Sequence, residues 1–469
     1  MAACLAAIAF TLAPATAPAQ SPSSQAPPQP LTLAGALRFA LDHYPAVAAA
    51  RDMRQATAGQ VAVARADYLP RLDAVWQTNR ATPNNVFGQL LPQSVIPSLS
   101  GPVLPDGSSP SVWGSAAGAL LTWEPFDLGL RGARVKEAEA AVERARVEEG
   151  LTRLAVVQAV GTAFFTVATA ERAWTAADAD VQRRDLLART AHALADAQLR
   201  PGAEASRADA ELAAARTRAL QASQAIAVAK ASLGQALGVT TGEIEVDSTG
   251  LAAPAAPAAD PAPSSAGHPL VRIGQAAIDV AAAREATLAR SNLPRLLVQS
   301  SVFARGTGAN PEGPFDRGGD GLAPERVNWA AGVQIVVPNL FDFSALRARR
   351  AAATAATAAE TARRDEATLA VTAQQRIAEA QFAAALAIAA NTPIQLDAAR
   401  QSETQARARY DAGLASLVEV ADAQGLLAVA DYQDAVARVD VWRAELARAV
   451  AAGDVEALLG RLGSSGGGR

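Results

Sequence analysis

The sequence contains two copies of one pattern, and this internal repeat constrains the fold more than any other feature. Four landmarks of the first half recur in the same order in the second half, at offsets of 224, 224, 215 and 211 residues. A single short match would be chance, whereas an ordered series across the chain predicts two copies of one structural unit, at 20–253 and 270–462. The matched pairs are Pro45 with Pro269, Pro70 with Pro294, Glu124-Pro-Phe-Asp-Leu128 with Asn339-Leu-Phe-Asp-Phe343, and Arg200-Pro-Gly-Ala203 with Asp411-Ala-Gly-Leu414.

Each half contains a long stretch without proline. There are 75 residues between Pro125 and Pro201, and 54 between Pro338 and Pro393. Strong helix formers dominate both stretches, and 75 helical residues would be roughly 110 Å long. Apolar residues recur at mixed three- and four-residue spacing with alanines on the flanks. This pattern predicts long helices, about 128–238 and 344–460, that touch neighbours on two sides as in a wall. A two-stranded coiled coil is the alternative.

Each half also contains two segments in which apolar residues alternate with small or polar residues. They lie at about 71–80, 112–124, 295–305 and 327–337, and each is long enough to cross a bilayer as a tilted strand. Four of the six tryptophans fall in these segments, near their ends, as membrane-interface aromatics do: Trp76, Trp113, Trp123 and Trp329. Two hairpins of a soluble β-domain would show the same alternation and are the alternative.

Four strands cannot form a closed transmembrane barrel, because open strand edges are not tolerated in lipid and the smallest such barrels have about eight strands. Several copies of the chain must therefore combine their strands. Two copies would give a barrel filled by side chains, whereas three would give twelve strands and a lumen. A conduit consequently needs at least three chains.

Composition argues against several other classes of protein. The formal net charge of −4 gives no basic surplus for nucleic-acid binding. A single cysteine and three histidines exclude a disulfide framework and supply no catalytic triad or metal cluster. His43 and His268 lie at matched positions beside prolines, where capping or packing of a helix is expected rather than metal binding. No enzyme activity, cofactor or metal site is predicted.

The ends of the chain and the link between the halves carry no predicted fold. Residues 1–19 resemble a signal peptide, although the positive charge at its start is missing, so translation could begin upstream and Cys4 could be a lipid-attachment site. No later run of about 18 apolar residues occurs, so no membrane-spanning helix is expected. An Ala/Pro linker is predicted at 254–269 and a flexible Gly/Ser tail at 463–469.

Several motifs together resemble TolC-family outer-membrane efflux proteins. They are Leu31-Thr-Leu-Ala-Gly-Ala-Leu37, His43-Tyr-Pro45, the two Leu-Pro-Arg-Leu segments, Phe126-Asp-Leu-Gly129, and the segment from Arg409 to Gln424. The resemblance implies a homotrimer in the outer membrane of a Gram-negative bacterium, with a twelve-stranded β-barrel continued by a helical barrel in the periplasm. It implies passive export in a tripartite efflux or type I secretion system, from an inner-membrane transporter through a periplasmic adaptor.

The resemblance also implies site residues at the periplasmic tips. The two helical hairpins of the family fold back at turns centred on glycine, which accepts a positive φ. The corresponding residues are implied to contact the adaptor: Arg200, Pro201, Gly202, Gly413 and Leu414.

Tyr410, Glu419 and Asp422 match residues at the family's periplasmic aperture. Rings of three carboxylates would favour cations, and ordinary solvated carboxylates are the alternative reading. Ala415 replaces a basic residue that ties the closed state in the best-known member, so the closing contacts here must differ. Asp209 lies one position from the expected acidic site of the first repeat. A soluble periplasmic coiled-coil adaptor or scaffold is the alternative to the channel as a whole.

Overall fold

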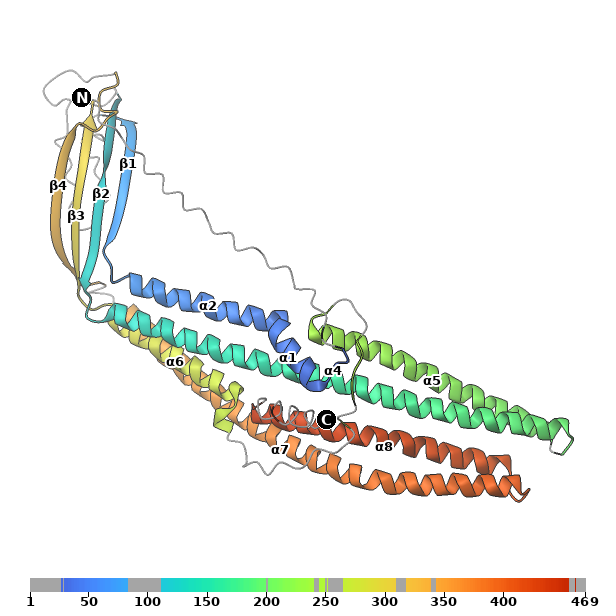
Figure 1. Ribbon diagram of the computed structural model, residues 1–469. Helices are drawn as coiled ribbons and strands as arrows, with labels where there is room; N and C mark the ends of the chain where they lie inside the picture. The colour runs from blue at the N-terminus through green and yellow to red at the C-terminus, as the bar shows by residue number, and fades with distance from the viewer. Residues whose placement is uncertain are drawn as a thin grey trace.

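The computed structural model describes residues 27, 29–82, 111–199, 201–239, 244–248, 251, 265–308, 318–338, 343–454 and 460. A four-stranded sheet forms one end of the molecule, and long helices run from it to two tips (Figure 1). The predicted signal peptide, Cys4 and the predicted tail lie outside the described residues, as does most of the linker.

The two repeats build the same unit of a helix, two strands and a long helical hairpin. In the first repeat the elements are α1 (Leu33–His43), α2 (Pro45–Ala66), β1 (Arg71–Ala81), β2 (Val112–Phe126), α4 (Leu130–Asp196) and α5 (Gly202–Leu237). In the second they are the 3-10 helix η2 (Ser265–Gly267), α6 (Pro269–Arg290), β3 (Arg295–Thr307), β4 (Arg326–Val336), α7 (Phe343–Asp411) and α8 (Leu417–Ala452). This arrangement confirms the predicted fold class: mainly helical, with four strands per chain and an internal repeat.

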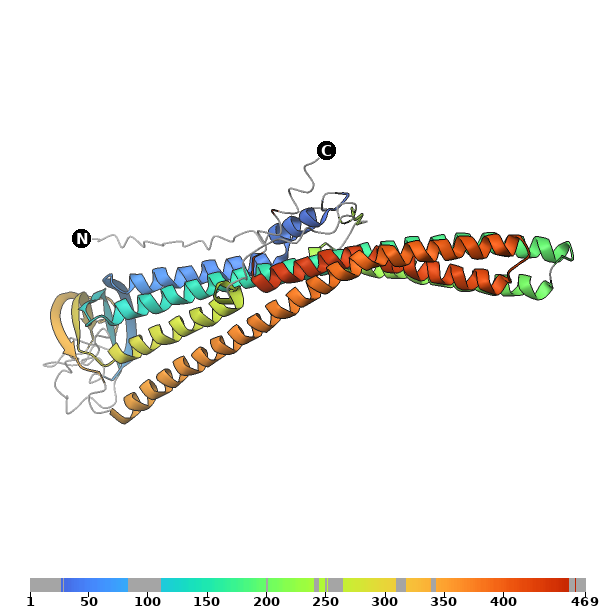
Figure 2. The ribbon, with the colours of Figure 1, turned by 90° about the horizontal axis from the view of Figure 1, so that it is seen from below.

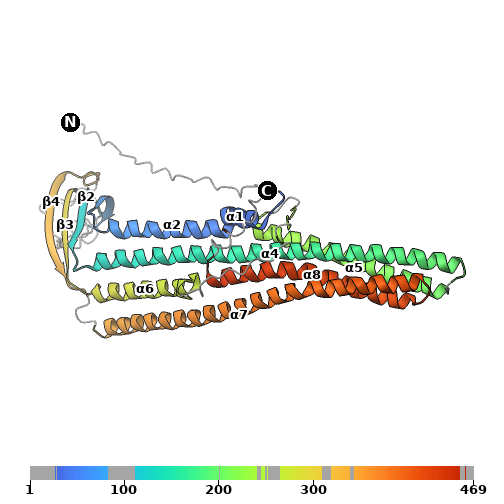
Figure 3. The same cartoon turned by 60° about the horizontal axis from the view of Figure 1, so that its bottom comes forward.

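The strands and the helices below them follow the same order around the molecule. The sheet is antiparallel in the order β1-β2-β3-β4. Below it, α2, α4, α6 and α7 lie side by side in that order, each joined to its own strand (Figure 3). Towards the tips, α5 pairs with α4 and α7 with α8, while α4 contacts α8. The chain is thus one curved wall (Figure 2), rather than a two-stranded coiled coil.

The main apolar core lies halfway along the helices. Leu37 of α1, Phe164 of α4, Leu233 of α5 and Leu446 of α8 are all buried in it. The chain before α1 covers this core by pairing with the segment that follows α5. Leu31 forms a parallel β-bridge with Val246, and its N–H donates to Glu245 O at 2.7 Å. Burial of this cluster fixes the short first helix against the wall at its midpoint.

Two long helices have a high mean hydropathy, although the sequence predicted no membrane-spanning helix. Windows in α4 and α7 are long and apolar enough on average to cross a membrane, with 50% and 22% of the window buried. Neither window is a continuous apolar run. These helices have 67 and 69 residues, continue with arginine and glutamate, and bury part of their surface against neighbouring helices. We attribute the signal to alanine content.

A buried ion pair fixes the junction between β2 and α4. Asp127 accepts hydrogen bonds from the Arg131 backbone at 2.7 Å, from its Nε at 2.9 Å and from the Gly129 N–H at 3.0 Å. The Arg131 guanidinium also stacks on the ring of Tyr68 and donates to Asp67 O. Burial of Asp127 opposes its ionisation, but the hydrogen bonds outweigh burial and hold its pKa below the ordinary value.

We expect Asp127→Asn to destabilise the protein by about 3–5 kcal/mol, because it leaves the buried Arg131 charge without its carboxylate. Urea titration in detergent at neutral pH measures this. The lowered pKa of Asp127 stabilises the fold above about pH 3.9, the ordinary value for an aspartate. This contribution is lost as the pH falls through the pKa of the folded state. The difference in stability between the variant and wild type should therefore shrink in acid. As a control, Asp67→Asn removes an exposed ion pair in which Asp67 lies 3.9 Å from Arg134. This substitution should cost at most about 1 kcal/mol.

Candidate functional site

One face of the sheet carries the large apolar side chains of all four strands. The register aligns Leu72 with Leu121, Leu121 with Ser300, and Ser300 with Ala331, so alternate residues of every strand share this face. Its side chains are strongly exposed, with Trp329 at 79% and Val327 at 75%. The other large members that are exposed are Leu72, Trp76, Leu121, Trp123, Val302, Val333 and Ile335. Such a continuous apolar face needs a nonaqueous environment.

The opposite face of the sheet is more polar, although it also carries the buried Val112, Leu120 and Phe303. Gln299 donates to Thr122 across β2 and β3 at 3.2 Å, and Arg71 pairs with Asp73 on β1 at 3.2 Å. Small residues such as Gly118 also lie here; a Cβ at this glycine would collide with Phe303 on the neighbouring strand. This face suits a water-filled lumen.

Both edges of the sheet are open among the strands that the structure describes in one chain. Within these strands β1 pairs only with β2, and β4 only with β3. The row of helices below the sheet is open in the same way, because α2 and α7 lie at its two ends. Leu369 of α7 is 74% exposed, and Val63 on α2 is also exposed. Next to Val63, a shallow hollow of about 460 Å³ runs along α2 and is lined by Ala58, Val61, Ala62, Arg65, Ala66 and Leu69.

The four tryptophans of the strands do not all lie near strand ends. Trp113 and Trp123 lie towards the two ends of β2; Trp113 stacks with Arg80, and Trp123 Nε1 donates to Tyr68 O at 3.1 Å. Trp329 is the fourth residue of β4. Trp76, however, lies in the middle of β1 opposite Ala117, so the expectation of an end position was wrong for this residue.

The helical tips differ in the two repeats. The α7–α8 turn contains Gly413 with φ 73°, and Leu414 beside it is 72% exposed. In the α4–α5 turn the positive φ belongs to Gln198, while Pro201 is the N-cap of α5 and Gly202 its first residue. The expectation of a glycine-centred turn is therefore correct for the second tip and wrong for the first. Arg200 lies outside the described residues.

The three predicted aperture residues have different environments. Tyr410 is 3% exposed and packs in the cluster of Ala188, Leu212, Leu417 and Val420, where α4, α5, α7 and α8 meet.

Glu419 forms a capping box with Ser416 at the start of α8, and its carboxylate lies 3.6 Å from Arg409. Asp422 is exposed one turn further along α8. The two carboxylates therefore lie close together near the tip, whereas Tyr410 is built into the wall.

Sequence reasoning missed a network of charges that joins the two helical hairpins above the tips. Arg184 of α4 is buried, with Asp180 at 3.1 Å and Glu211 of α5 at 2.7 Å. One residue earlier, Arg183 lies 3.5 Å from Asp431 of α8, which is also 3.6 Å from Arg400 of α7. The i,i+4 spacing of Asp180 and Arg184 is visible in the sequence, but their partners on other helices are not.

The two matched histidines have separate structural roles. His268 caps α6, since its Nδ1 accepts from the Leu270 N–H at 3.1 Å and its Nε2 donates to Val450 O at 3.2 Å. Burial lowers its pKa, although the bond to Val450 opposes this. His43 stacks on Phe39 at the end of α1. The part of the chain that the structure describes has no group of three or more potential metal ligands.

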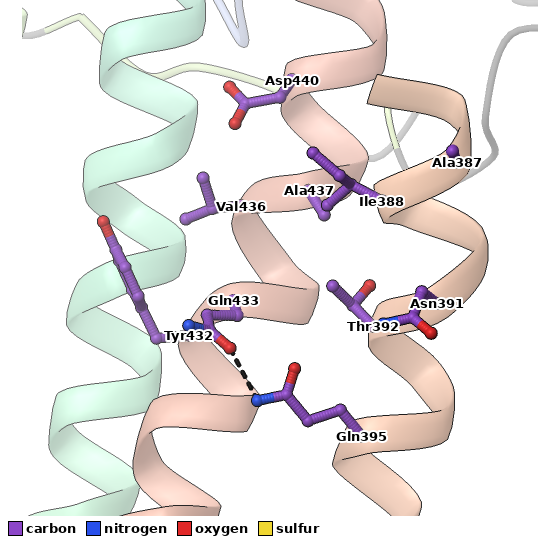
Figure 4. Close-up of a pocket in the computed structure, with 10 residues that line it drawn as sticks. All are labelled: Ala387, Ile388, Asn391, Thr392, Gln395, Tyr432, Gln433, Val436, Ala437 and Asp440. Carbon is purple, nitrogen blue, oxygen red and sulfur yellow. Dashed lines mark hydrogen bonds between the residues drawn. The ribbon is translucent and has the colours of Figure 1, made fainter. Parts of the chain in front are cut away.

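A hollow of about 530 Å³ lies between α7 and α8. Figure 4 shows its lining, in which Gln395 donates to Gln433 at 2.8 Å across the two helices. Ile388, Tyr432 and Val436 contribute apolar surface. Asp440, its lining carboxylate, is paired with Arg443 at 2.5 Å. The described lining contains no histidine, cysteine or serine.

A family model described as "Outer membrane efflux protein" matches residues 36–239 and 266–454. This chain belongs to the outer membrane efflux protein family. Proteins of this family are non-enzymatic outer-membrane channels that extend into the periplasm, form trimers and belong to tripartite efflux systems. The TolC-family resemblance is thereby confirmed, and nothing supports the alternative of a soluble adaptor.

Solved outer-membrane channels share the fold of this family member. VceC from Vibrio cholerae is 17% identical with a TM-score of 0.72, and the match covers 90% of this chain and 96% of VceC. The open state of MtrE from Neisseria gonorrhoeae is 17% identical with a TM-score of 0.70, covering 90% and 89%. CmeC from Campylobacter jejuni is 14% identical with a TM-score of 0.70, covering 92% and 89%. No curated protein gives a significant match.

We expect Val333→Arg to block insertion of this efflux protein into the outer membrane. Val333 is 67% exposed on the apolar face, and an arginine there costs about 2–4 kcal/mol near the bilayer midplane. Fractionation of membranes followed by immunoblotting measures the inserted protein. Gln334→Arg places the same side chain one residue away on the polar face and should insert normally; normal insertion of both variants would contradict the assignment of the faces.

Proposed function

We propose that three copies of this chain close into one conduit and passively pass solutes from an inner-membrane transporter, through a periplasmic adaptor, to the outside. The observation that carries the proposal is that β1 and β4 are both open edges of a sheet whose outer face is apolar. Unpaired backbone groups are too costly in lipid to remain open. Pairing β4 of one copy with β1 of the next satisfies every strand and gives twelve strands around a lumen.

The helices support the same closure. Because they follow the order of the strands, α7 of one copy would meet α2 and, nearer the tips, α5 of the next copy. The helices that would meet in this contact carry exposed apolar side chains, including Leu369 on α7 and Leu220 on α5. The alanine-lined hollow along α2 would receive the neighbouring helix at close approach. One set of contacts thus closes both the sheet and the helical wall.

We propose that the two tips contact the adaptor. Leu199 and Leu414, at the turns of the two hairpins, are 71% and 72% exposed. The ends of the hairpins lie far from the sheet (Figure 1). Exposed leucines next to turns are suited to pack against a partner helix. In this proposal Arg200, Pro201 and Gly202 form one contact, and Gly413 with Leu414 forms the other. Trp76, Trp113, Trp123 and Trp329 are proposed to face lipid.

Purified protein tests the closure directly. We expect extraction to require detergent, native mass spectrometry to give three chains, and reconstitution in planar bilayers to give discrete conductance steps. A lone chain released by osmotic shock without detergent, with no conductance, would contradict the proposal.

The acidic residues near the tip are proposed to favour cations at the periplasmic aperture. Glu419→Gln with Asp422→Asn removes both charges, and glutamine preserves the capping box with Ser416. We expect the permeability ratio of K⁺ to Cl⁻, obtained from reversal potentials in bilayers, to fall at least twofold. Arg409→Gln removes the neighbouring positive charge and should change the ratio in the opposite direction. Equal ratios in all three proteins would leave no role for these charges in conduction.

A further inference from the structure

Trp76 occupies an unusual place for a tryptophan of a membrane strand. It is the sixth of the 11 residues of β1, an edge strand, and its side chain on the apolar face is 68% exposed. Tryptophans of transmembrane barrels gather at the interfaces with water, where the indole N–H is solvated. Here the N–H donates to Thr78 on the same strand at 3.2 Å, so it needs no water. The ring lies at the edge that β1 presents to a second copy.

The other edge strand carries a small side chain at the same position along its length. Ala331 is the sixth of the 11 residues of β4, is exposed on the apolar face, and lies opposite Ser300 of β3. This is the smallest cross-strand pair on the apolar face of β3 and β4. The pairs on either side of it are Trp329 with Val302 and Val333 with Val298. One level of small side chains thus lies between two levels of bulky ones.

The alternation of both edge strands restricts how β4 of one copy can pair with β1 of the next. The exposed apolar residues have even numbers on β1 and odd numbers on β4. A shift by one residue would turn the apolar face of one copy into the lumen, so only shifts by two residues are allowed. Placing Arg71 opposite Val336, which aligns the two strand ends next to the helices, meets this condition. Because both strands have 11 residues, Trp76 then lies opposite Ala331.

The polar face agrees with this register. Asp73 of one copy would lie opposite Gln334 of the next, and Asn79 opposite Asn328, so that polar side chains meet polar side chains across the boundary. Cross-strand hydrogen bonds between such pairs stabilise a sheet.

The tilt of the strands also agrees with it. The register within one chain leads from Arg71 through Thr122 and Gln299 to Gly332. In the proposed register Gly332 pairs with Val75 of the next copy, so the shift from 71 to 75 is four residues per chain. Three chains would shift by about 12 residues, roughly 40 Å, around twelve strands that together span roughly 58 Å. The resulting tilt of about 35° lies within the range of transmembrane barrels.

We propose that Trp76 packs across the boundary between copies onto Ala331 of the neighbouring chain, with Arg71 opposite Val336. The inference rests on the proposed closure of three copies, to which it adds the register and a residue that holds it. A large aromatic side chain over a level of small ones gives complementary packing, and aromatic cross-strand contacts stabilise sheets. A shift by two residues in either direction would place the ring opposite Trp329 or Val333, where bulky side chains already fill the surface.

Disulfide formation between introduced cysteines tests the register. The chain has a single cysteine, so the variants are made with Cys4→Ser. In the proposed register Ala74→Cys of one copy lies directly opposite Val333→Cys of the next, with about 4.5–5.5 Å between the Cβ atoms. Partners displaced by two residues are about 7–8 Å away, too far for a disulfide. These displaced partners of Ala74→Cys are Ala331→Cys and Ile335→Cys.

Oxidation is carried out in isolated outer membranes and followed on nonreducing gels. We expect the directly opposite pair to form linked dimers and trimers at least tenfold faster than either displaced pair. Gln334→Cys lies on the other face of β4 and should form no link with Ala74→Cys.

Exchange of the two side chains tests the packing of Trp76. Trp76→Ala and Ala331→Trp should each lower at least twofold the share of trimer that survives heating in detergent, measured by native mass spectrometry. The double variant places a large side chain opposite a small one again and should recover most of the trimer. As a control, Val302→Ala removes exposed apolar surface from β3, which is paired on both sides within the chain, and should leave the trimer unchanged.

The outcomes separate this inference from the closure on which it rests. Absence of trimers in the wild type would contradict the closure itself. Trimers in which Ala74→Cys reacts fastest with a displaced partner would overturn the register and leave the closure intact. An unchanged trimer in Trp76→Ala, or no recovery in the double variant, would overturn the role of Trp76. If Trp76→Ala fails to insert, recovery of insertion by adding Ala331→Trp decides that role.

Discussion

The open edges of β1 and β4 are the constraint on which the rest of the structure depends. In hydrocarbon, an unpaired backbone N–H or C=O has no water to bond, so a four-stranded sheet with an apolar face is incomplete by itself. Because α2, α4, α6 and α7 follow the strands in the same order, pairing of the strands also brings together the open helices of neighbouring copies. The same geometric requirement therefore shapes a membrane part and a periplasmic part made of different secondary structure.

A wall one layer thick cannot rely on a central core, and this chain distributes its stabilising contacts along the wall instead. An apolar cluster around Phe164 holds the middle, a second around Tyr410 holds the tips, and the charges of Arg183 and Arg184 lie between them. At the membrane end, the buried Asp127–Arg131 pair fixes the direction in which α4 leaves β2. Alanine permits the long helices to approach closely, and it also raises their mean hydropathy without making them lipid-spanning.

The sequence was sufficient to predict the strands and long helices, because both leave periodic or compositional signals within a few residues. Alternation marked the apolar face of β4, and the absence of proline between Pro125 and Pro201 marked α4. What failed depends on contacts between distant segments. Trp76 was expected near a strand end, but register with β2 places it at mid-strand opposite Ala117. Glycine at the first tip was expected to accept the positive φ, which Gln198 adopts instead. The bond from Arg184 to Glu211, 27 residues away, follows from how α4 packs on α5.

The two acidic residues near the tip differ in how far folding explains their position. Glu419 and Asp422 lie at the narrow end by the proposed arrangement, and Glu419 also caps α8, so its position is explained by folding whether or not it acts on ions. Arg409 lies 3.6 Å from the Glu419 carboxylate and partly offsets its charge. Charge that folding does not require is stronger evidence of function than charge that folding uses. By this argument Asp422, which is exposed one turn further along α8, is the better indicator of an effect on ions.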